Sequence, residues 1–170
     1  MSGARDNLLT GRLAEHLVCA ELSRMGFIAT TFSHNVPIYD ILATNSDCQT
    51  VPIQVKASRN GWWRGYAKKW LDIELDEENE MQNILGLSQL KSLDPIWVCV
   101  VVGETRKEDI FFVLTESALQ AIVAKNYTED MNSYKGKRPK NWKALDCWWG
   151  VEHLSEFKDR WDLIKSRLGS

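Results

Sequence analysis

Three polar side chains share one side of a predicted pair of β-strands, and their types suit the handling of a phosphate ester. The segment from Tyr39 to Ser58 has the pattern of two strands joined by a polar turn, and strand side chains point alternately to opposite faces. This alternation predicts that Asp40, Gln54 and Lys56 lie on one face, with apolar side chains on the other. A carboxylate, an amide and a lysine gathered on one face indicate a site that holds something charged.

The oxygen atoms in this set are ligands of the kind that Mg²⁺ prefers. Asp40 supplies a hard carboxylate oxygen, and Mg²⁺ typically takes one or two carboxylates and completes its shell with waters and substrate phosphate oxygens. The side-chain oxygen of Gln54 and the backbone carbonyl of Val55 could complete the protein's share. Lys56 beside the metal could hold or deprotonate an attacking water, or offset charge on the phosphorus.

A second carboxylate comes from a predicted helix ahead of the hairpin. Residues from about Asp6 to Met25 are good helix formers, and Gly26 follows as a stop. In a helical projection Glu15 falls outside the narrow polar face, among apolar side chains, where a bare carboxylate is costly. Glu15 should therefore be paired, protonated or bound to a cation, and it could orient a metal-held water. Alternatively, this edge of the helix is half buried and Glu15 reaches water.

The rest of the chain has the elements of a mixed sheet. Continuous apolar and β-branched residues at 96–102 are typical of a strand buried on both faces. In chain order after the first helix, the predicted elements are a strand at 27–32, the hairpin, a helix at 81–93, strands at 96–102 and 109–114, a helix ending near 125, a basic loop at 126–143 and an amphipathic helix at about 154–168. This order favours an α/β or α+β architecture, with a mixed central sheet flanked by helices.

Length and composition favour one intracellular domain. The 170 residues are 44% hydrophobic and contain no Pro/Gly/Ser-rich linker, so a single domain over 1–170 is expected, with an irregular basic and acidic insert at about 59–80. The four cysteines are far apart and form no Cys-x-x-Cys pair, which favours a reducing compartment. Without a signal pattern or an apolar run of membrane-spanning length, the protein is expected to be cytoplasmic, with no membrane partner.

Charge is unevenly distributed along the chain, although the net charge is only −2. The segments 59–69 and 134–143 are basic and contain no acidic residue, whereas Asp72 to Glu80 is densely acidic. The candidates for contacts with nucleic-acid phosphates are Arg59, Arg64, Lys68, Lys69, Lys135, Lys137, Arg138 and Lys140. Aromatic residues interleave with the first basic segment, where they could stack on unpaired bases or instead pack in the core or an interface. The acidic stretch would be a solvated face, a steering element or a contact for a basic partner.

The order and spacing of these residues resemble the PD-(D/E)XK nuclease superfamily, which includes restriction endonucleases and archaeal-type Holliday junction resolvases. The resemblance covers roughly Gly11 to Ser58. By this resemblance Asp40 is the metal-binding acid, and Glu15 is the acid carried by an early helix. Gln54 takes the (D/E) position, and Lys56 is the catalytic lysine. The resemblance implies a restriction endonuclease-like fold, Mg²⁺ as cofactor with Mn²⁺ as a substitute, and a nucleic-acid substrate, expected to be DNA.

Two positions depart from the superfamily pattern. Tyr39 stands where a proline usually precedes the aspartate, which matters little because only the aspartate carries chemistry. Gln54 stands where an acid is usual, and an uncharged amide oxygen should bind Mg²⁺ less tightly. Some active branches of the superfamily use Gln-x-Lys, and Glu15 then becomes the second source of negative charge.

The sequence therefore predicts a metal-dependent nuclease, with three alternatives left open. In the simplest alternative, Gln54 and Lys56 merely occupy the solvent face of an antiparallel strand. A second is a catalytically weak or inactive member of the fold that binds nucleic acid or a protein partner. A third is an interaction protein, such as a homodimer, whose C-terminal helix and tryptophans form the interface.

Overall fold

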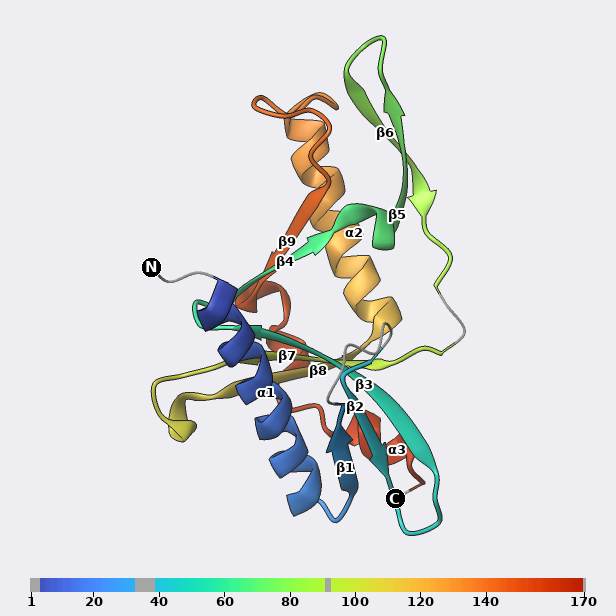
Figure 1. Ribbon diagram of the computed structural model, residues 1–170. Helices are drawn as coiled ribbons and strands as arrows, with labels where there is room; N and C mark the ends of the chain where they lie inside the picture. The colour runs from blue at the N-terminus through green and yellow to red at the C-terminus, as the bar shows by residue number, and fades with distance from the viewer. Residues whose placement is uncertain (1–3, 33–38, 91–92, 170) are drawn as a thin grey trace. The chain divides into compact units, whose positions relative to one another are not determined.

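Strands and helices are mixed along the chain, as the sequence predicts (Figure 1). The computed structural model describes residues 4–32, 39–90 and 93–169. Within these ranges, none of the helices is both long and apolar enough to cross a membrane. The chain forms two compact units, each built from discontinuous segments and each described by itself. The first unit comprises residues 1–61, 93–116 and 154–170, and the second comprises residues 62–92 and 117–153.

The first unit is built on a five-stranded mixed sheet. The strands follow the order β1-β2-β3-β7-β8, in which β3 and β7 are parallel and the other neighbours are antiparallel. The elements of this unit are α1 (Ala4–Arg24), β1 (Ile28–Thr31), β2 (Ile41–Thr44), β3 (Thr50–Ser58), β7 (Ile96–Val101), the 3₁₀-helix η2 (Arg106–Glu108), β8 (Ile110–Thr115), the 3₁₀-helix η4 (Ser155–Phe157) and α3 (Asp162–Arg167).

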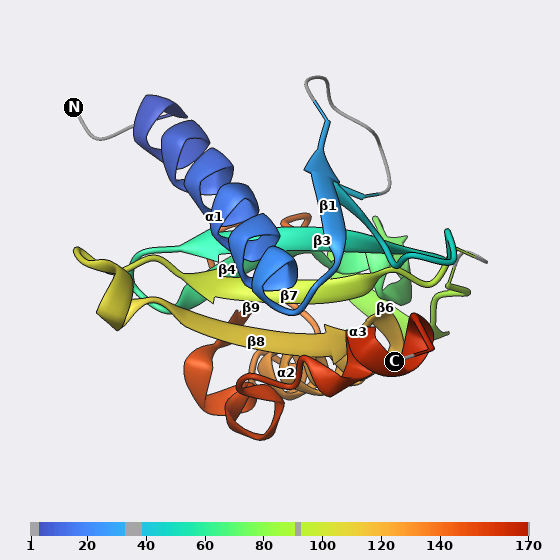
Figure 2. The same ribbon diagram turned by 90° about the horizontal axis from the view of Figure 1, so that it is seen from below.

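The core of the first unit lies between α1 and the sheet. Ala14, Val18 and Leu22 recur at every fourth position of α1 and are fully buried, because this stripe of the helix lies on the sheet (Figure 2). The stripe packs in one cluster with Ile53 and Val55 of β3. Alternation along β3 therefore leaves the intervening polar side chains on the face away from α1.

The second unit contains two short antiparallel strand pairs and most of α2. β4 pairs with β9, and β5 pairs with β6. The Gln120 side chain of α2 donates hydrogen bonds to the backbone carbonyls of Trp70 (2.9 Å) and Ser88 (2.8 Å), which ties one end of the β5–β6 pair to the helix. The elements are β4 (Trp62–Tyr66), the 3₁₀-helix η1 (Ala67–Lys69), β5 (Leu71–Asp76), β6 (Met81–Leu87), α2 (Glu116–Ser133), β9 (Asp146–Gly150) and the 3₁₀-helix η3 (Val151–His153).

The elements of the first unit agree well with the sequence. The predicted first helix and the strands at 27–32, 96–102 and 109–114 are confirmed, with ends that differ by no more than about two residues, as is usual for element boundaries. The predicted hairpin is confirmed as β2 and β3. The expectation of one domain over 1–170 stays a prediction.

The helix predicted at 81–93 is wrong. Residues 81–87 form strand β6, which pairs with β5. The apolar spacing that suggested a buried helical stripe does not correspond to burial, since Leu85 and Leu87 are 63% and 60% exposed. Pairing with a neighbouring strand decides the structure here, and the local period does not.

Two further predictions are wrong in part. The basic loop predicted at 126–143 begins later than expected, because α2 continues to its buried Met131 and beyond. The helix predicted at 154–168 is interrupted, and only its second half is α3. Asp159 breaks it: this residue has φ of 54°, and its N–H donates to the carbonyl of Phe111 on β8 at 2.9 Å. The segment thus bonds to the sheet where a continuous helix was expected.

Candidate active site

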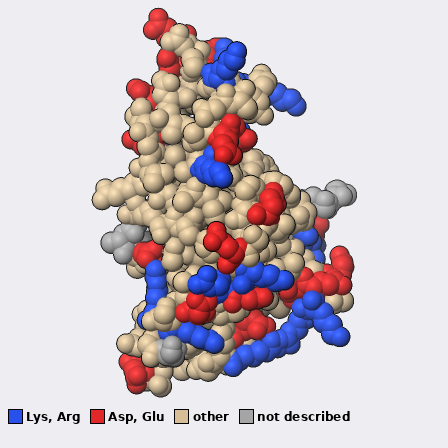
Figure 3. Space-filling view, turned by 180° about the vertical axis from the view of Figure 1, so that it is seen from behind, with Lys and Arg blue, Asp and Glu red and all other residues tan. Residues whose placement is uncertain are grey.

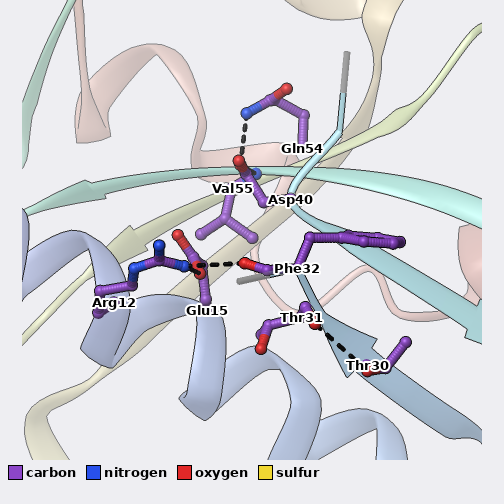
Figure 4. Close-up of polar contacts among 8 residues, drawn as sticks. All are labelled: Arg12, Glu15, Thr30, Thr31, Phe32, Asp40, Gln54 and Val55. Carbon is purple, nitrogen blue, oxygen red and sulfur yellow. Dashed lines mark hydrogen bonds and ion pairs between the residues drawn. The ribbon is translucent and has the colours of Figure 1, made fainter. Parts of the chain in front are cut away.

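The β2–β3 hairpin brings Asp40 and Gln54 into contact. Ile41 pairs with Ile53, and the N–H of Asp40 donates to the Ile53 carbonyl at 2.9 Å, which ties the start of β2 to β3. The Gln54 side-chain amide donates a hydrogen bond to Oδ2 of Asp40. The backbone N–H of Val55 donates to the same oxygen at 2.8 Å (Figure 4). Two donors of the hairpin therefore hold the Asp40 carboxylate in place.

Gln54 and Lys56 belong to the face of β3 away from α1. Ile53 and Val55 are 0% and 8% exposed beneath the helix, whereas Gln54 and Lys56 are half buried. Figure 4 shows the Gln54 amide and the Val55 side chain pointing to opposite sides of the strand. Asp40 joins this polar face through its hydrogen bond with Gln54. Asp40, Gln54 and Lys56 are therefore gathered on the hairpin.

Glu15 lies on the α1 side of the sheet, with Val55 and away from the Gln54 amide (Figure 4). Its side chain is 16% exposed and accepts a hydrogen bond of 3.0 Å from Nη1 of Arg12, which precedes it by about one turn of α1. The same arginine nitrogen donates to the carbonyl of Phe32 at 3.2 Å. Glu15 is therefore paired, with the Arg12 guanidinium as its partner, which is one of the states expected for a carboxylate among apolar side chains.

Arg12 is the residue of this site that the sequence reasoning missed. The available signal was the i, i+3 spacing of an arginine and a glutamate, which places two side chains side by side on a helix surface. That spacing suggests an ion pair but says nothing of the hairpin. Only the packing of α1 on the sheet brings the guanidinium close enough to act on the Asp40 carboxyl.

Asp40 lies within reach of three other charged groups. Burial raises the pKa of the Asp40 carboxyl, and the Glu15 carboxylate raises it further. The hydrogen bond from Val55 and the cations of Lys56 and Arg12 lower that pKa, but the effect of burial is larger. Two carboxylates and two cations balance each other in this cluster. A further cation beside Asp40 would stabilise a charged form that burial disfavours.

The donors predicted for a metal are all oxygen atoms. Asp40, Glu15 and Gln54 offer carboxylate and amide oxygens, which fit Mg²⁺ or Mn²⁺ and differ from the His and Cys ligands typical of zinc. Among the described residues, no group of three His, Cys, Asp or Glu side chains is placed to hold an ion. Gln54 turns its nitrogen to Asp40, so ligation through its oxygen requires the amide to turn over. The contribution of the Val55 carbonyl stays a prediction.

Part of the acidic stretch neutralises the basic loop of the second unit. Lys137 pairs with Glu80, and Lys143 pairs with Glu77 at 2.7 Å. Exposed pairs of this kind contribute little to stability, so their main effect is to reduce the local charge. The three roles considered for Asp72 to Glu80 stay predictions.

The remaining residues predicted to contact phosphates differ in their surroundings. Arg64 pairs with Asp146 at 2.6 Å, and Arg138 lies 5.1 Å from the ring centroid of Tyr127. Lys69 lies over the ring of the adjacent tryptophan. The exposed residues without an acidic partner among the described residues are Arg59, Lys68, Lys135 and Lys140. On the face shown in Figure 3, described basic and acidic side chains are interspersed, with no broad area of one sign.

Comparison by sequence finds no relative, since no protein-family model and no curated protein matches the chain. Comparison of structures finds proteins with a similar fold. A bacterial homing endonuclease is similar with a TM-score of 0.52 and 15% sequence identity, over 97% of this chain and 95% of the other. A Holliday junction resolvase from the archaeal hyperthermophile Archaeoglobus fulgidus is similar with a TM-score of 0.43 and 12% identity, over 90% of this chain and 93% of the other.

The likeness to the homing endonuclease concerns the fold. The chain has a restriction endonuclease-like fold, a mixed α+β architecture with a mixed central sheet flanked by helices, as the sequence predicts. The Gln-x-Lys form of the motif and the roles of its residues stay predictions.

Proposed function

We propose that the chain is a metal-dependent nuclease that hydrolyses phosphodiester bonds in DNA. The observation that carries this proposal is the contact between Asp40 and Gln54 on the hairpin of a restriction endonuclease-like fold. A fold alone leaves the chemistry open, because unrelated activities share folds. The activity is argued from the site, where a half-buried acid, an amide and Lys56 meet.

Mg²⁺, or Mn²⁺ in its place, is the proposed cofactor, held by Asp40, Gln54 and Glu15 with the backbone carbonyl of Val55. When bound, it would lower the pKa of a coordinated water and offset negative charge on the phosphate. Burial favours a cation beside Asp40, but Gln54 adds no charge and Arg12 already neutralises Glu15. Affinity for the free ion should therefore be low, with substrate phosphate oxygens completing the coordination.

The side chains have separate tasks in the proposed reaction. Lys56 would hold the attacking water and, as a cation, offset charge that builds on the phosphate; in its neutral form it would instead take the proton of that water. Glu15 would act from the α1 side by accepting a hydrogen bond from a water, which requires it to share its bond with Arg12. Arg12 would be a positioning residue, since it anchors Glu15 and the end of the first strand region through the Phe32 carbonyl.

DNA is proposed as substrate from the resemblance to PD-(D/E)XK nucleases and from the exposed basic side chains. Arg59 follows the strand that carries Gln54 and Lys56 by a single residue and is exposed. In the second unit Lys68, Lys135 and Lys140 are exposed. Such side chains would bind the phosphate backbone without reading sequence. All four cysteines are free, in keeping with a cytoplasmic enzyme.

Cleavage of supercoiled plasmid DNA in Mg²⁺ or Mn²⁺ tests the proposal. Lys56→Ala should lose about 10²–10⁴-fold in rate, the usual contribution of a proton-transferring group, and Asp40→Ala should cut no DNA. Two exposed residues of the same unit serve as matched controls, since Lys107→Ala and Asp47→Ala should cut like the parent.

Two outcomes would count against the proposal. Unchanged cleavage by a purified, folded Lys56→Ala variant would remove that residue from the mechanism. A parent protein that neither cuts nor binds Mn²⁺ in a calorimetric titration would favour the alternative of an inactive member that only binds nucleic acid or protein.

A further inference from the structure

The β4–β9 pair of the second unit presents rings and a guanidinium to solvent. Trp62, Arg64 and Tyr66 alternate along β4 on its outward side, and Trp148 of β9 stands opposite Arg64. The three rings are 47%, 57% and 45% exposed, and the arginine side chain is 60% exposed. A single exposed ring is ordinary, but several on one small face mark an interaction surface. These four residues are called the aromatic face.

The aromatic face is backed by closely packed side chains. Trp63, Trp149 and Cys147 point to the other side of the strand pair and are at most 2% exposed. Gly65 lies so close to the Trp149 ring that a Cβ atom there would come within 3.0 Å of a ring carbon and 3.1 Å of the Cys147 sulfur. The strands therefore rest directly on a buried indole. Packing on that side holds the backbone that carries the outward rings.

Arg64 is fixed among these rings. Its guanidinium lies 5.7 Å from the centroid of the Trp148 ring, and its Nε donates to the Asp146 carboxylate at 2.8 Å. Arg138 donates to the backbone carbonyl of Asp146 at 2.8 Å, and the Glu152 carboxylate lies over Gly150 at the other end of the strand pair. Flat rings beside a guanidinium suit nucleotides with unpaired bases, because bases stack on the rings and a phosphate can meet Arg64.

We propose that the aromatic face binds single-stranded nucleic acid by stacking unpaired bases on Trp148, Tyr66 and Trp62. Bases inside a duplex are already stacked on both sides, so a surface of rings selects a strand whose bases are free. An apolar protein segment fits this face less well, because no outward side chain of the strand pair is aliphatic. The inference rests on the proposed nuclease function and adds a substrate class to it, namely nucleic acid with an unpaired strand.

Fluorescence anisotropy of a labelled single-stranded oligodeoxynucleotide, measured in EDTA, tests this binding without cleavage. Trp148→Ala should raise the Kd about 5- to 150-fold, the loss expected for one stacked base. Trp148→Phe keeps a ring and should lose much less. Tyr134→Ala removes an exposed tyrosine elsewhere in the second unit and is the matched control, expected to bind like the parent. The Kd for the corresponding duplex should change little in any variant.

Three results would overturn the proposal: parental binding of the single strand by Trp148→Ala, an equal loss in Tyr134→Ala, or an equal loss of duplex binding. The phenylalanine variant guards against misfolding. If its far-UV circular dichroism and urea midpoint match the parent and it still binds as weakly as the alanine variant, stacking is excluded. A parent that binds single strands but cuts nothing contradicts the nuclease alone, whereas one that cuts but does not prefer single strands contradicts the aromatic face alone.

Discussion

The β2–β3 and β4–β9 pairs both bury one side, yet they hold their outward side chains differently. In β2–β3, Ile53 and Val55 pack beneath α1. The polar side chains on the opposite face are half buried, and the Gln54 amide is hydrogen-bonded to Asp40. In β4–β9, buried indoles pack beneath the strands, and the aromatic face stands open to solvent. The same period-two alternation thus builds two unlike surfaces.

Solvent access is what separates them. Where water is restricted, burial itself disfavours a charge, as the raised pKa of the Asp40 carboxyl shows. Where water is plentiful, charges are screened and the flat area of the rings is the stronger means of contact. The first arrangement suits chemistry on a bound group, and the second suits binding. Three substitutions test this contrast.

The largest effect is expected on the buried side of β4–β9. Trp149 is 1% exposed, and Trp149→Ala should lower the free energy of unfolding by about 3–5 kcal/mol, as usual for a buried tryptophan. Trp148→Ala, one residue away on the aromatic face, should cost about 1 kcal/mol or less. Urea denaturation followed by far-UV circular dichroism measures both. Equal losses would erase the distinction between the two sides of the pair.

An intermediate effect is expected where charge is added to the half-buried hairpin. Gln54→Glu sets a second carboxylate beside Asp40 and should tighten Mn²⁺ binding about tenfold, or roughly 1.4 kcal/mol. Because neighbouring carboxylates share a proton until a cation displaces it, calorimetry in two buffers should also detect proton release. Gln49→Glu, in the exposed turn of the same hairpin, is the matched control. Unchanged affinity in Gln54→Glu would separate this position from the metal.

The smallest effect concerns pH. Burial raises the pKa of the Asp40 carboxyl above its ordinary 3.8, so just above that value the native state holds a proton that the unfolded chain has lost. In EDTA, stability should fall as pH rises through the raised pKa and then level off. Asp40→Asn keeps an acceptor for Gln54 and Val55 and should flatten this part of the profile. Urea titrations from about pH 4 to 7 measure it, and parallel profiles for the two proteins would contradict the assignment.

The hairpin could be predicted because its signal is local. Alternation over nine residues of β3 and a short turn suffice to bring Asp40 beside Gln54. The surroundings could not be predicted in the same way. The Arg12 partner of Glu15 depends on how α1 packs on the sheet. The apolar spacing in β6 fits a helix as well as a strand, so the local pattern does not decide between them.

The aromatic face shows a second limit of local reading. Trp63 and Trp148 look alike in a sequence, but one is buried and the other is exposed. Their surroundings are set by the pairing of β4 with β9, about eighty positions apart, and no short-range pattern encodes a contact at that separation. The sequence could suggest that rings stack on bases or fill a core, and the structure has both exposed and buried rings.

The interleaving of the two units constrains how the protein can be made. Ile164 and Leu168 are fully buried in the core of the first unit, yet they follow every described strand of both units in the sequence. During synthesis on the ribosome, the strands of the sheet therefore emerge before part of the core that packs on them. In the same way, β4 emerges well before β9, the strand with which it pairs. The first unit cannot finish folding while the second is still being synthesised. A chain stopped after β9 would carry the whole hairpin of Asp40 and Gln54 on a sheet that lacks the buried side chains of Ile164 and Leu168.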